Sequence, residues 1–513
     1  MSDPKEAEHQ NTSESSDQGE FLEENAPGES ENPMLIASDS YENLNYEILD
    51  GTSTVQRQTP NNVESNETST GEESNNEEQT ETANDVAKKK KEMVPAEEDH
   101  DDVNSEHWRS QSKHIFILSE AGKPIYSRHG SEDKLVTIMG VMQALVSFVG
   151  DSKDSLRCMI AGDHKFVFLV RDHLLLVGVS SGMDSTHQIL LQLTYVYNQV
   201  ISVLTQSTLC KIFKQRRNYD LRRMLSGAEK FFDNLINLMD SEPGLLLGAV
   251  RCLPLDGSVR EIIAQSIVQH AKIKDLVFGL IITNNQLIAL VRIKKYYLHP
   301  MDLHLIMNLV NASESFKTAE SWTPLCLPKF DSSGFLQAHI SYLDDSCNTC
   351  LLLLTVDRES FFTLSDCKSK IKERLLKYNA LRAISDSLQK TAYGIQQCGI
   401  NDLRHFLYKS KSTAQYTSPE LEAPYVTQKE KDRLFGLYKY LHHRIHTSGR
   451  PLKILFHVGP YETLLGWVTQ GFELYAVFGP LVTKTSAIHA VNKLLRWIKR
   501  EEDRLFILNS VTF

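Results

Sequence analysis

Residues 178–182 match a motif that carries the catalytic serine in one large class of hydrolases. The run GVSSG has the form G-x-S-x-G, in which Ser180 would be the nucleophile. Such a serine must stand at the carboxyl edge of a parallel sheet built through helical crossovers. Here the candidate strands 165–170 and 174–179 are joined by a connection so short that they must be antiparallel. We therefore interpret the motif as a glycine-bearing turn.

Cys347 and Cys350 have the spacing CxxC. A zinc site would need two further ligands at suitable spacing, and a redox CxxC would open a helix in a thioredoxin-like unit. This motif instead leads into LLLLTV at 351–356, which is typical of a strand. We interpret the pair as two thiols that border a strand.

His442 and His446 stand four residues apart in a predicted helix, and His443 adjoins them. This spacing suits two metal ligands on one helical face. However, Arg444 lies alongside, and the run HHRIH contains no acidic residue, which favours a solvated face. P-loop, G-x-G-x-x-G and HExxH motifs are missing from the sequence. We predict no catalytic residue, no metal ligand and no cofactor.

Charge is divided unevenly along the chain. Residues 1–107 contain 29 acidic and six basic residues, a net charge of −23, whereas the remaining 37 acidic and 49 basic residues give +12. The front segment is also poor in large apolar residues, so we predict a disordered acidic tail. The polar start of the chain has no signal-peptide pattern, which predicts a cytoplasmic protein with reduced cysteines.

The densest basic cluster of the body lies in KIFKQRRNYDLRR at 211–223, with Asp220 as its one acidic residue. A basic surface of this kind favours an anionic partner, and we expect a membrane rather than nucleic acid because no nucleic-acid module surrounds it. The tail, by charge, is predicted to compete with lipids for this surface. The predicted membrane-facing residues are Lys211, Lys214, Arg216, Arg217, Arg222 and Arg223.

The first unit of the body, 113–149, has the pattern of a strand, a turn, a second strand and a helix. Ser131 is the expected N-cap of that helix. An apolar stripe that includes Leu135, Met139 and Met142 would cover a sheet, yet no residue from Leu135 to Gly150 is charged. The run is too short to cross a bilayer. Either the helix is buried inside its own domain or a second polypeptide packs on its outer face; the candidate interface residues are Val136, Gly140, Gln143 and Ser147.

Strand groups and long helices recur three times after residue 107, so the predicted class is α+β, with antiparallel sheets and flanking helices. Candidate elements include helix 186–204, the hairpin 276–283 and 286–292, helices 361–388 and 429–446, and strand 505–508. The strand assigned to LLLGAVRCLPL opens the second unit. The predicted boundaries are 1–107 for the tail, then 108–240 with a basic helical extension, 241–398 and 399–513.

Several long strings, in order, are similar to the SAND family of vacuolar fusion proteins, which supply the Mon-one subunit of the Mon-one/Ccz-one complex. They are SQSKHIFILSEAGKPIYSRHG at 110–130, NYDLRRML at 218–225, LLLGAVRC at 245–252, WTPLCLPKF at 322–330, LRHFLYKSKSTAQYTSPELEAPY at 403–425 and KLLRWIKREEDRLFI at 493–507. The resemblance covers residues 108–513; Asp331 departs from the family's usual Asn. It implies three longin domains.

The resemblance further implies a heterodimer with a Ccz-one-type longin subunit, joined through the first longin domains. That complex is a guanine-nucleotide exchange factor for the late-endosomal Rab GTPase, recruited by the early-endosomal Rab and by phosphoinositide membranes. It drives endosome maturation and fusion with the lysosome or vacuole, including that of autophagosomes, from the cytoplasmic side of these membranes. Such exchange needs no covalent chemistry, which agrees with the missing catalytic motifs. The alternative is a longin-type trafficking adaptor that binds Rab GTPases and membranes without catalysing exchange.

Overall fold

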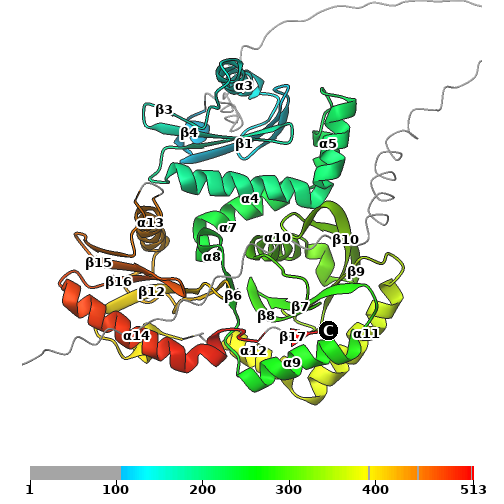
Figure 1. The fold of residues 1–513 in the computed structure, drawn as a ribbon, viewed down its shortest axis with the longest axis vertical. Coiled ribbons are helices and arrows are strands. Elements are labelled where there is room, and N and C mark those ends of the chain that lie inside the picture. Colours follow the sequence, from blue (N-terminus) through cyan, green and yellow to red (C-terminus); the bar gives the residue numbers. More distant parts are fainter. Residues whose placement is uncertain (1–104, 391–392, 448–449, 510) are drawn as a thin grey trace, which may run out of the picture. The chain divides into compact units, whose positions relative to one another are not determined.

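A computed structural model describes residues 105–390, 393–447, 450–509 and 511–513. Within these residues the strands form one sheet of five and one of twelve, with helices on their faces (Figure 1). The α+β class is therefore confirmed. The predicted acidic tail lies outside the described residues as far as residue 104, and its predicted end at 107 falls inside a short helix, α2 (Glu106–Ser110), which the Ser105 side chain caps.

The first domain contains the five-stranded sheet, the helices on its two faces and a helical extension. Its elements are α2, β1 (Lys113–Ser119), β2 (Pro124–Ser127), α3 (Val136–Asp151), β3 (Cys158–Ala161), β4 (His164–Arg171), β5 (Leu174–Ser180), α4 (Thr186–Leu204), α5 (Gln206–Gln215), α6 (Arg222–Leu225) and α7 (Glu229–Ser241). A connecting segment follows, with α8 (Pro243–Leu247), β6 (Val250–Cys252) and α9 (Gly257–His270).

The second and third domains share the twelve-stranded sheet. The second has β7 (Leu276–Thr283), β8 (Gln286–Arg292), α10 (Pro300–Asn311), a 3-10 turn η2 (Glu314–Lys317), β9 (Ser321–Leu327), β10 (Asp331–Tyr342), β11 (Cys350–Thr355), α11 (Phe361–Lys377) and α12 (Ala380–Gln389). After η3 (Ile395–Cys398), the third has β12 (Leu403–Ser410), β13 (Gln415–Thr417), α13 (Gln428–Ile445), β14 (Ile454–Val458), β15 (Thr463–Val468), β16 (Phe472–Phe478), α14 (Lys484–Leu505) and β17 (Val511–Thr512).

The three domains have the same strand order. Neighbouring strands run β2-β1-β5-β4-β3 in the first domain, β8-β7-β11-β10-β9 in the second and β13-β12-β16-β15-β14 in the third. In each, the second, first, fifth, fourth and third strands follow one another, and all pairs are antiparallel. β6 joins the last two domains, because it pairs in parallel with both β13 and β8. The helix after the second strand is therefore equivalent in the three domains: α3, α10 and α13.

The sheet of the first domain is apolar on both faces. Ile115 and Ile117 of β1 point into the core beneath α4, whereas Phe116 and Leu118 point into the core beneath α3. The α4 core also includes Cys326 and Phe335 of the second domain, so α4 is buried between two domains.

Helix α10 of the second domain is buried from residue 300 to residue 310. It contacts α4 and α7, which belong to the first domain. The Asn308 amide donates hydrogen bonds to Gln199 Oε1 at 2.8 Å and to the Phe231 carbonyl at 2.9 Å. This chain itself therefore covers the outer face of α10.

Several predicted elements are confirmed and several are wrong. Helix 186–204 and both strands of the 276–292 hairpin match closely. The helix predicted over 361–388 is two helices, because Asn379 adopts a left-handed backbone with φ 55° between them. Ser131 is not an N-cap: residues 132–135 form turns, and α3 begins at Val136.

Two predicted strands are also wrong. LLLGAVRC is the short helix α8 followed by β6, since short apolar runs do not distinguish a helix from a strand. Residues 505–508 are the end of α14 and an irregular segment. There the Gln415 side chain occupies both backbone groups of Ile507, accepting from its N–H and donating to its carbonyl, so no strand pairs with them. β9 was not predicted, and it is an edge strand that contains Pro324.

Candidate interaction surfaces and side-chain clusters

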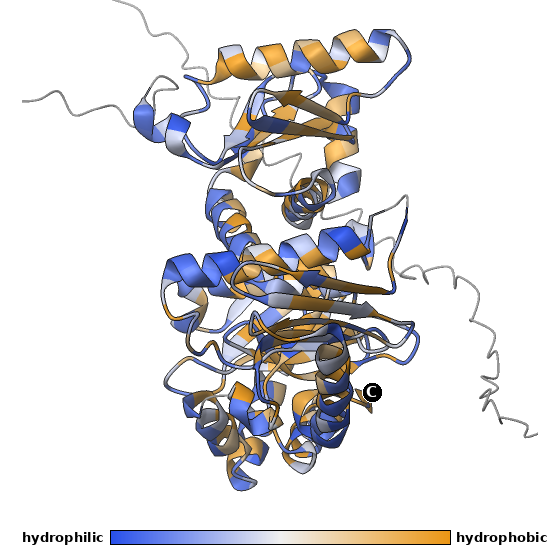
Figure 2. Ribbon diagram, turned by 90° about the vertical axis from the view of Figure 1, so that its left-hand side faces the viewer, coloured by the Kyte–Doolittle hydropathy of each residue, from blue (hydrophilic) through white to orange (hydrophobic). Residues whose placement is uncertain are grey.

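Helix α3 packs one side on the sheet of the first domain and leaves an apolar side exposed. Met139 and Met142 are buried in the core. On the outer side the exposed fractions are 48% for Val136, 56% for Val141 and 75% for Phe148. Figure 2 shows α3, at the top of the view, as orange and pale along most of its length. The outer face of α3 is thus accessible, apolar and uncharged.

Three of the four residues predicted for this face are exposed, namely Val136, Gly140 and Ser147. Gln143 is half-buried instead. Its side chain lies against Gly122 in the β1–β2 turn, and its amide donates to Ser147 Oγ at 3.3 Å. The exposed face is centred about one residue later along the helix, so sequence reasoning missed Val141 and Phe148. We define the α3 face as Val136, Gly140, Val141, Ala144, Ser147 and Phe148.

The predicted basic residues lie in the second half of α5, in the loop after it and at the start of α6. Lys214, Arg216, Arg217 and Arg223 are exposed, and Lys211 is half-buried. Arg222 pairs with Asp220 at 3.2 Å and with Asp133 at 3.0 Å. Asp133 stands in the turn just before α3, so the structure brings this basic patch next to the start of the α3 face.

The G-x-S-x-G run has a structural explanation. A Cβ atom at Gly178 would stand 2.6 Å from Ile189 Cγ2, so this glycine allows α4 to pack closely on β5. Ser180 is 2% exposed, and its hydroxyl accepts the N–H of Gly182 at 3.1 Å. The run is therefore the end of β5 followed by a bend, so the turn interpretation holds only for Ser181 and Gly182. Cys347 and Cys350 are free thiols at the start of β11, and burial raises the pKa of Cys350 above its usual range.

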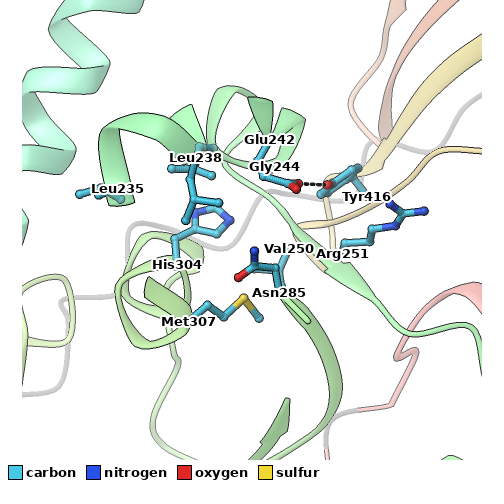
Figure 3. Close-up of a pocket in the computed structure, with 11 residues that line it drawn as sticks. Leu235, Leu238, Glu242, Gly244, Val250, Arg251, Asn285, His304, Met307 and Tyr416 are labelled. Atoms are coloured by element: carbon cyan, nitrogen blue, oxygen red, sulfur yellow. Dashed lines mark hydrogen bonds between the residues drawn. The ribbon is translucent and has the colours of Figure 1, made fainter. Parts of the chain in front are cut away.

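A small cavity lies where α7, β6, α10 and β13 meet (Figure 3). Its volume is about 30 Å³, room for a water molecule rather than for an organic ligand. Tyr416 of β13 lines the cavity, and its hydroxyl donates to Glu242 Oε2 at 3.3 Å. His304 of α10 also lines it and forms a hydrogen bond with the Tyr195 hydroxyl at 2.9 Å. The three domains are therefore joined here by buried polar contacts.

An ion-pair group also links the first and third domains. The Asp184 carboxylate lies 3.1 Å from Lys113 Nζ of β1 and 3.1 Å from Lys439 Nζ of α13. Burial by itself would raise the pKa of Asp184, but the two lysines outweigh it and lower that pKa. Such a buried carboxylate holds α13 against the first domain through charge.

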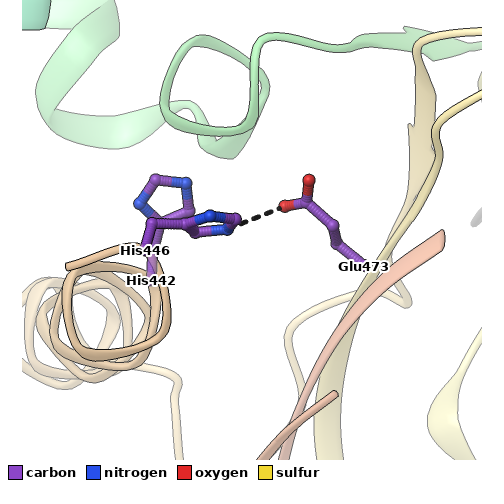
Figure 4. A group of neighbouring side chains, drawn as sticks. All are labelled: His442, His446 and Glu473. Carbon is purple, nitrogen blue, oxygen red and sulfur yellow. Dashed lines mark ion pairs between the residues drawn. The ribbon is translucent and has the colours of Figure 1, made fainter. Parts of the chain in front are cut away.

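The structure brings His442 and His446 together with an acid that sequence reasoning did not find. Glu473, at the start of β16, places Oε2 3.3 Å from His446 Nε2 (Figure 4). The centroids of the two imidazole rings lie 4.5 Å apart. The predicted solvated face is wrong at this point: Glu473 is 5% exposed and Nδ1 of His442 is buried. No sequence signal links position 473 to the HHRIH run, because only the fold brings β16 under α13.

In the described part of the chain, no helix combines the length and apolar character needed to cross a membrane. Three family models match, described as the first, second and third longin domains of FUZ, MON1 and HPS1. They cover residues 113–235, 274–373 and 402–502, respectively. Each match contains one set of five strands in the shared order, and the segment with α8, β6 and α9 falls between the first two matches. The three longin domains implied by the resemblance are therefore confirmed.

Whole-chain similarity is high to several curated proteins. The chain is 52% identical to the chicken (Gallus gallus) vacuolar fusion protein MON1 homolog A, over 82% of this chain and 77% of that one. It is 51% identical to the protein SAND of Takifugu rubripes, over 80% and 79% of the two chains. It is 43% identical to human vacuolar fusion protein MON1 homolog B, over 79% and 77%. With three longin domains and identity of this extent, the chain belongs to the MON1/SAND family of longin proteins.

Proposed function

We propose that this chain acts in vesicle trafficking and vacuolar fusion, as one subunit of a heterodimeric guanine-nucleotide exchange factor. Its partner is a Ccz-one-type longin subunit, and its substrate is the late-endosomal Rab GTPase. The observation that carries the proposal is the α3 face, which is apolar, uncharged and exposed. Monomeric proteins rarely expose such a surface without a partner.

The equivalent helices of the other domains support a protein partner for α3. Helix α10 has Asp302 as its single formally charged residue and is covered by α4 and α7. Helix α13 instead has four exposed charged residues, Lys429, Lys431, Asp432 and Arg444. Low charge therefore accompanies a covered helix in this fold, and α3 has low charge although its outer face is exposed among the described residues.

Exchange of this kind works by differential binding rather than by covalent chemistry. The GTPase holds its nucleotide through Mg²⁺, the phosphate-binding loop and the switch segments. A factor that binds the open, nucleotide-free form more tightly than the closed form speeds the loss of GDP. The chain needs no nucleophile for this, and we assign it no covalent activity.

We further propose that the exposed bases of the α5–α6 region contact phosphoinositide membranes of endosomes and lysosomes or vacuoles. The early-endosomal Rab would recruit the pair, which would then promote endosome maturation and autophagosome fusion. Each base near an anionic surface contributes about 1 kcal/mol. The double change Arg216→Glu and Arg217→Glu should weaken binding to phosphoinositide vesicles. The control is Lys377→Glu with Lys390→Glu, which changes two exposed lysines at the ends of α11 and α12.

The decisive experiment measures release of a fluorescent GDP analogue from the late-endosomal Rab. The chain with its partner should accelerate release strongly, and the chain alone should have little effect. Binding of the Rab by the pair without any acceleration would instead support the non-catalytic adaptor. Absence of both binding and acceleration would reject the proposed function.

A further inference from the structure

Three side chains of the kinds that bind metals converge between α13 and β16. His442 and His446 lie one helical turn apart on α13, and Glu473 is the second residue of β16. One potential ligand atom from each lies within 4.8 Å of the other two. Figure 4 shows the two imidazole rings on the same side of the helix, tilted against each other, with the Glu473 carboxylate opposite His446.

The strand geometry explains why Glu473 reaches the helix. Residues two apart on a strand point to the same face, so Glu473 and Tyr475 both face α13. Tyr475 confirms this orientation, because its hydroxyl donates to Glu473 Oε2 at 3.0 Å and lies 3.1 Å from His446 Nε2. The carboxylate is thereby held in place, which favours a preformed site.

The distances and burial suit a small divalent cation. Ligand atoms bound to Zn²⁺ at about 2.0–2.2 Å are about 3.3 Å apart in a tetrahedron. The separation of His446 Nε2 from Glu473 Oε2 is 3.3 Å. Within the described residues, Nδ1 of His442 is buried and has no hydrogen-bond partner. A bound metal ion would give this buried nitrogen the partner that it lacks.

Lysine side chains compete for the same carboxylate. Lys409 Nζ lies 3.4 Å and Lys411 Nζ 3.7 Å from Glu473 Oε1. The lysines lie against Oε1, whereas His446 Nε2 and the Tyr475 hydroxyl lie against Oε2. A bound cation would take Oε2 and displace the hydrogen bond of Tyr475, and the two lysines would weaken its affinity by repulsion.

We propose that His442, His446 and Glu473 bind one Zn²⁺ ion, with the fourth coordination position left for water. Two imidazoles with one carboxylate are a typical zinc donor set, whereas Ca²⁺ and Mg²⁺ prefer oxygen ligands alone. The ion ties the carboxyl-terminal end of α13 to the sheet of the third domain.

The test uses the full-length chain, purified without a histidine tag and treated with a chelator. Zinc chloride is titrated against a chromophoric chelator, and Co²⁺ is added separately for its visible absorption. We expect one equivalent of zinc. His446→Ala and Glu473→Gln should each weaken zinc binding by more than about 100-fold. Loss of a group that only hydrogen-bonds to a metal ligand already lowers metal affinity by about 10–100-fold. His443→Ala, next to the site, should bind zinc as the unchanged chain does.

A second variant covers the case in which these changes disturb folding. Lys409→Met removes a competing charge and retains an aliphatic side chain, so zinc affinity should rise. Thermal unfolding should show stabilisation by zinc in the unchanged chain and in His443→Ala, and none in Glu473→Gln. Failure of the unchanged chain to bind zinc, equal affinity in His446→Ala, or lower affinity in Lys409→Met would each overturn the proposal. Binding of iron in place of zinc would overturn the assignment of the metal.

Discussion

Helices α3 and α10 occupy the same position in two domains of the same fold, yet their outer faces meet different surroundings. Both are poor in charge. α10 is buried along its length by α4 and α7, whereas the α3 face is exposed, with Phe148 75% accessible. α13, in the third domain, is charged on its exposed side. The comparison teaches that low charge on this helix accompanies a cover, and our proposal for α3 assigns that cover to a partner subunit.

The physical reason is the cost of burying charge. A charged side chain under another element needs a partner that satisfies it, so covered helices lose charged residues. An exposed helix has no such restriction, and charge keeps it soluble. Asp184 and Lys439 illustrate the exception, since the charge that α13 buries is paired.

The largest expected effect comes from placing a charge on the covered helix. In Asn308→Asp, a carboxylate replaces the amide group that donates to Gln199 Oε1 and to the Phe231 carbonyl. An unpaired buried charge that faces two acceptors should cost about 3–5 kcal/mol in the free energy of unfolding. Urea denaturation of the full chain measures this. A loss below about 1 kcal/mol would contradict the view that α10 is closed by its own chain.

The next effect concerns pH, through the single carboxyl of α10. Burial raises the pKa of Asp302 from 3.8 to about 7. The folded chain thus holds the proton more tightly, and the stability due to this group is full below pH about 4 and is lost as pH rises through about 7. Asp302→Asn should remove about 2–4 kcal/mol of the stability difference between pH 4.5 and pH 8.

Urea denaturation of the unchanged chain and of Asp302→Asn at these two pH values gives two pH dependences of the free energy of unfolding. Their difference is the contribution of the Asp302 carboxyl. The other titrating groups cancel in that comparison. An equal pH dependence in the unchanged chain and in Asp302→Asn would show that the carboxyl does not titrate in this range.

A charge on the exposed α3 face should act on assembly instead. Phe148→Asp should weaken association with the longin partner by about 30-fold or more, because a buried aromatic anchor is worth about 2 kcal/mol. Phe362→Asp, on α11, is the matched control, since Phe362 is 79% exposed. Calorimetry of the two purified subunits measures the effect. If both variants bind the partner as the unchanged chain does, α3 is not the interface.

The smallest effect sharpens the contrast within the free chain. Val141→Glu, also on the α3 face, should change the free energy of unfolding of the isolated chain by less than about 0.5 kcal/mol, because its 56% exposed side chain packs little. Urea denaturation of the isolated chain is the measurement. A large loss would mean that the chain itself closes this face, so that α3 would resemble α10.

Much of the fold was predictable from local pattern, whereas the candidate sites were predictable only in part. The hairpin around Asn284 and Asn285 and the long helix α4 have strong local signals, and both are found as predicted. The α3 face was found from missing charge, although its centre is displaced because Gln143 packs against the β1–β2 turn while Val141 and Phe148 are exposed. The strand predicted at 505–508 is wrong because Leu505 ends α14 and the Gln415 side chain occupies the backbone groups of Ile507.

The sequence by itself determined the antiparallel α+β class, the threefold recurrence and the uncharged helix, because these follow from the periodicity and charge of consecutive residues. The tertiary structure alone decided which helix is covered and which acid meets His446. Strands and helices distant in the chain come together through apolar burial, and no local pattern records that α4 and α7 close α10 or that β16 places Glu473 beneath α13.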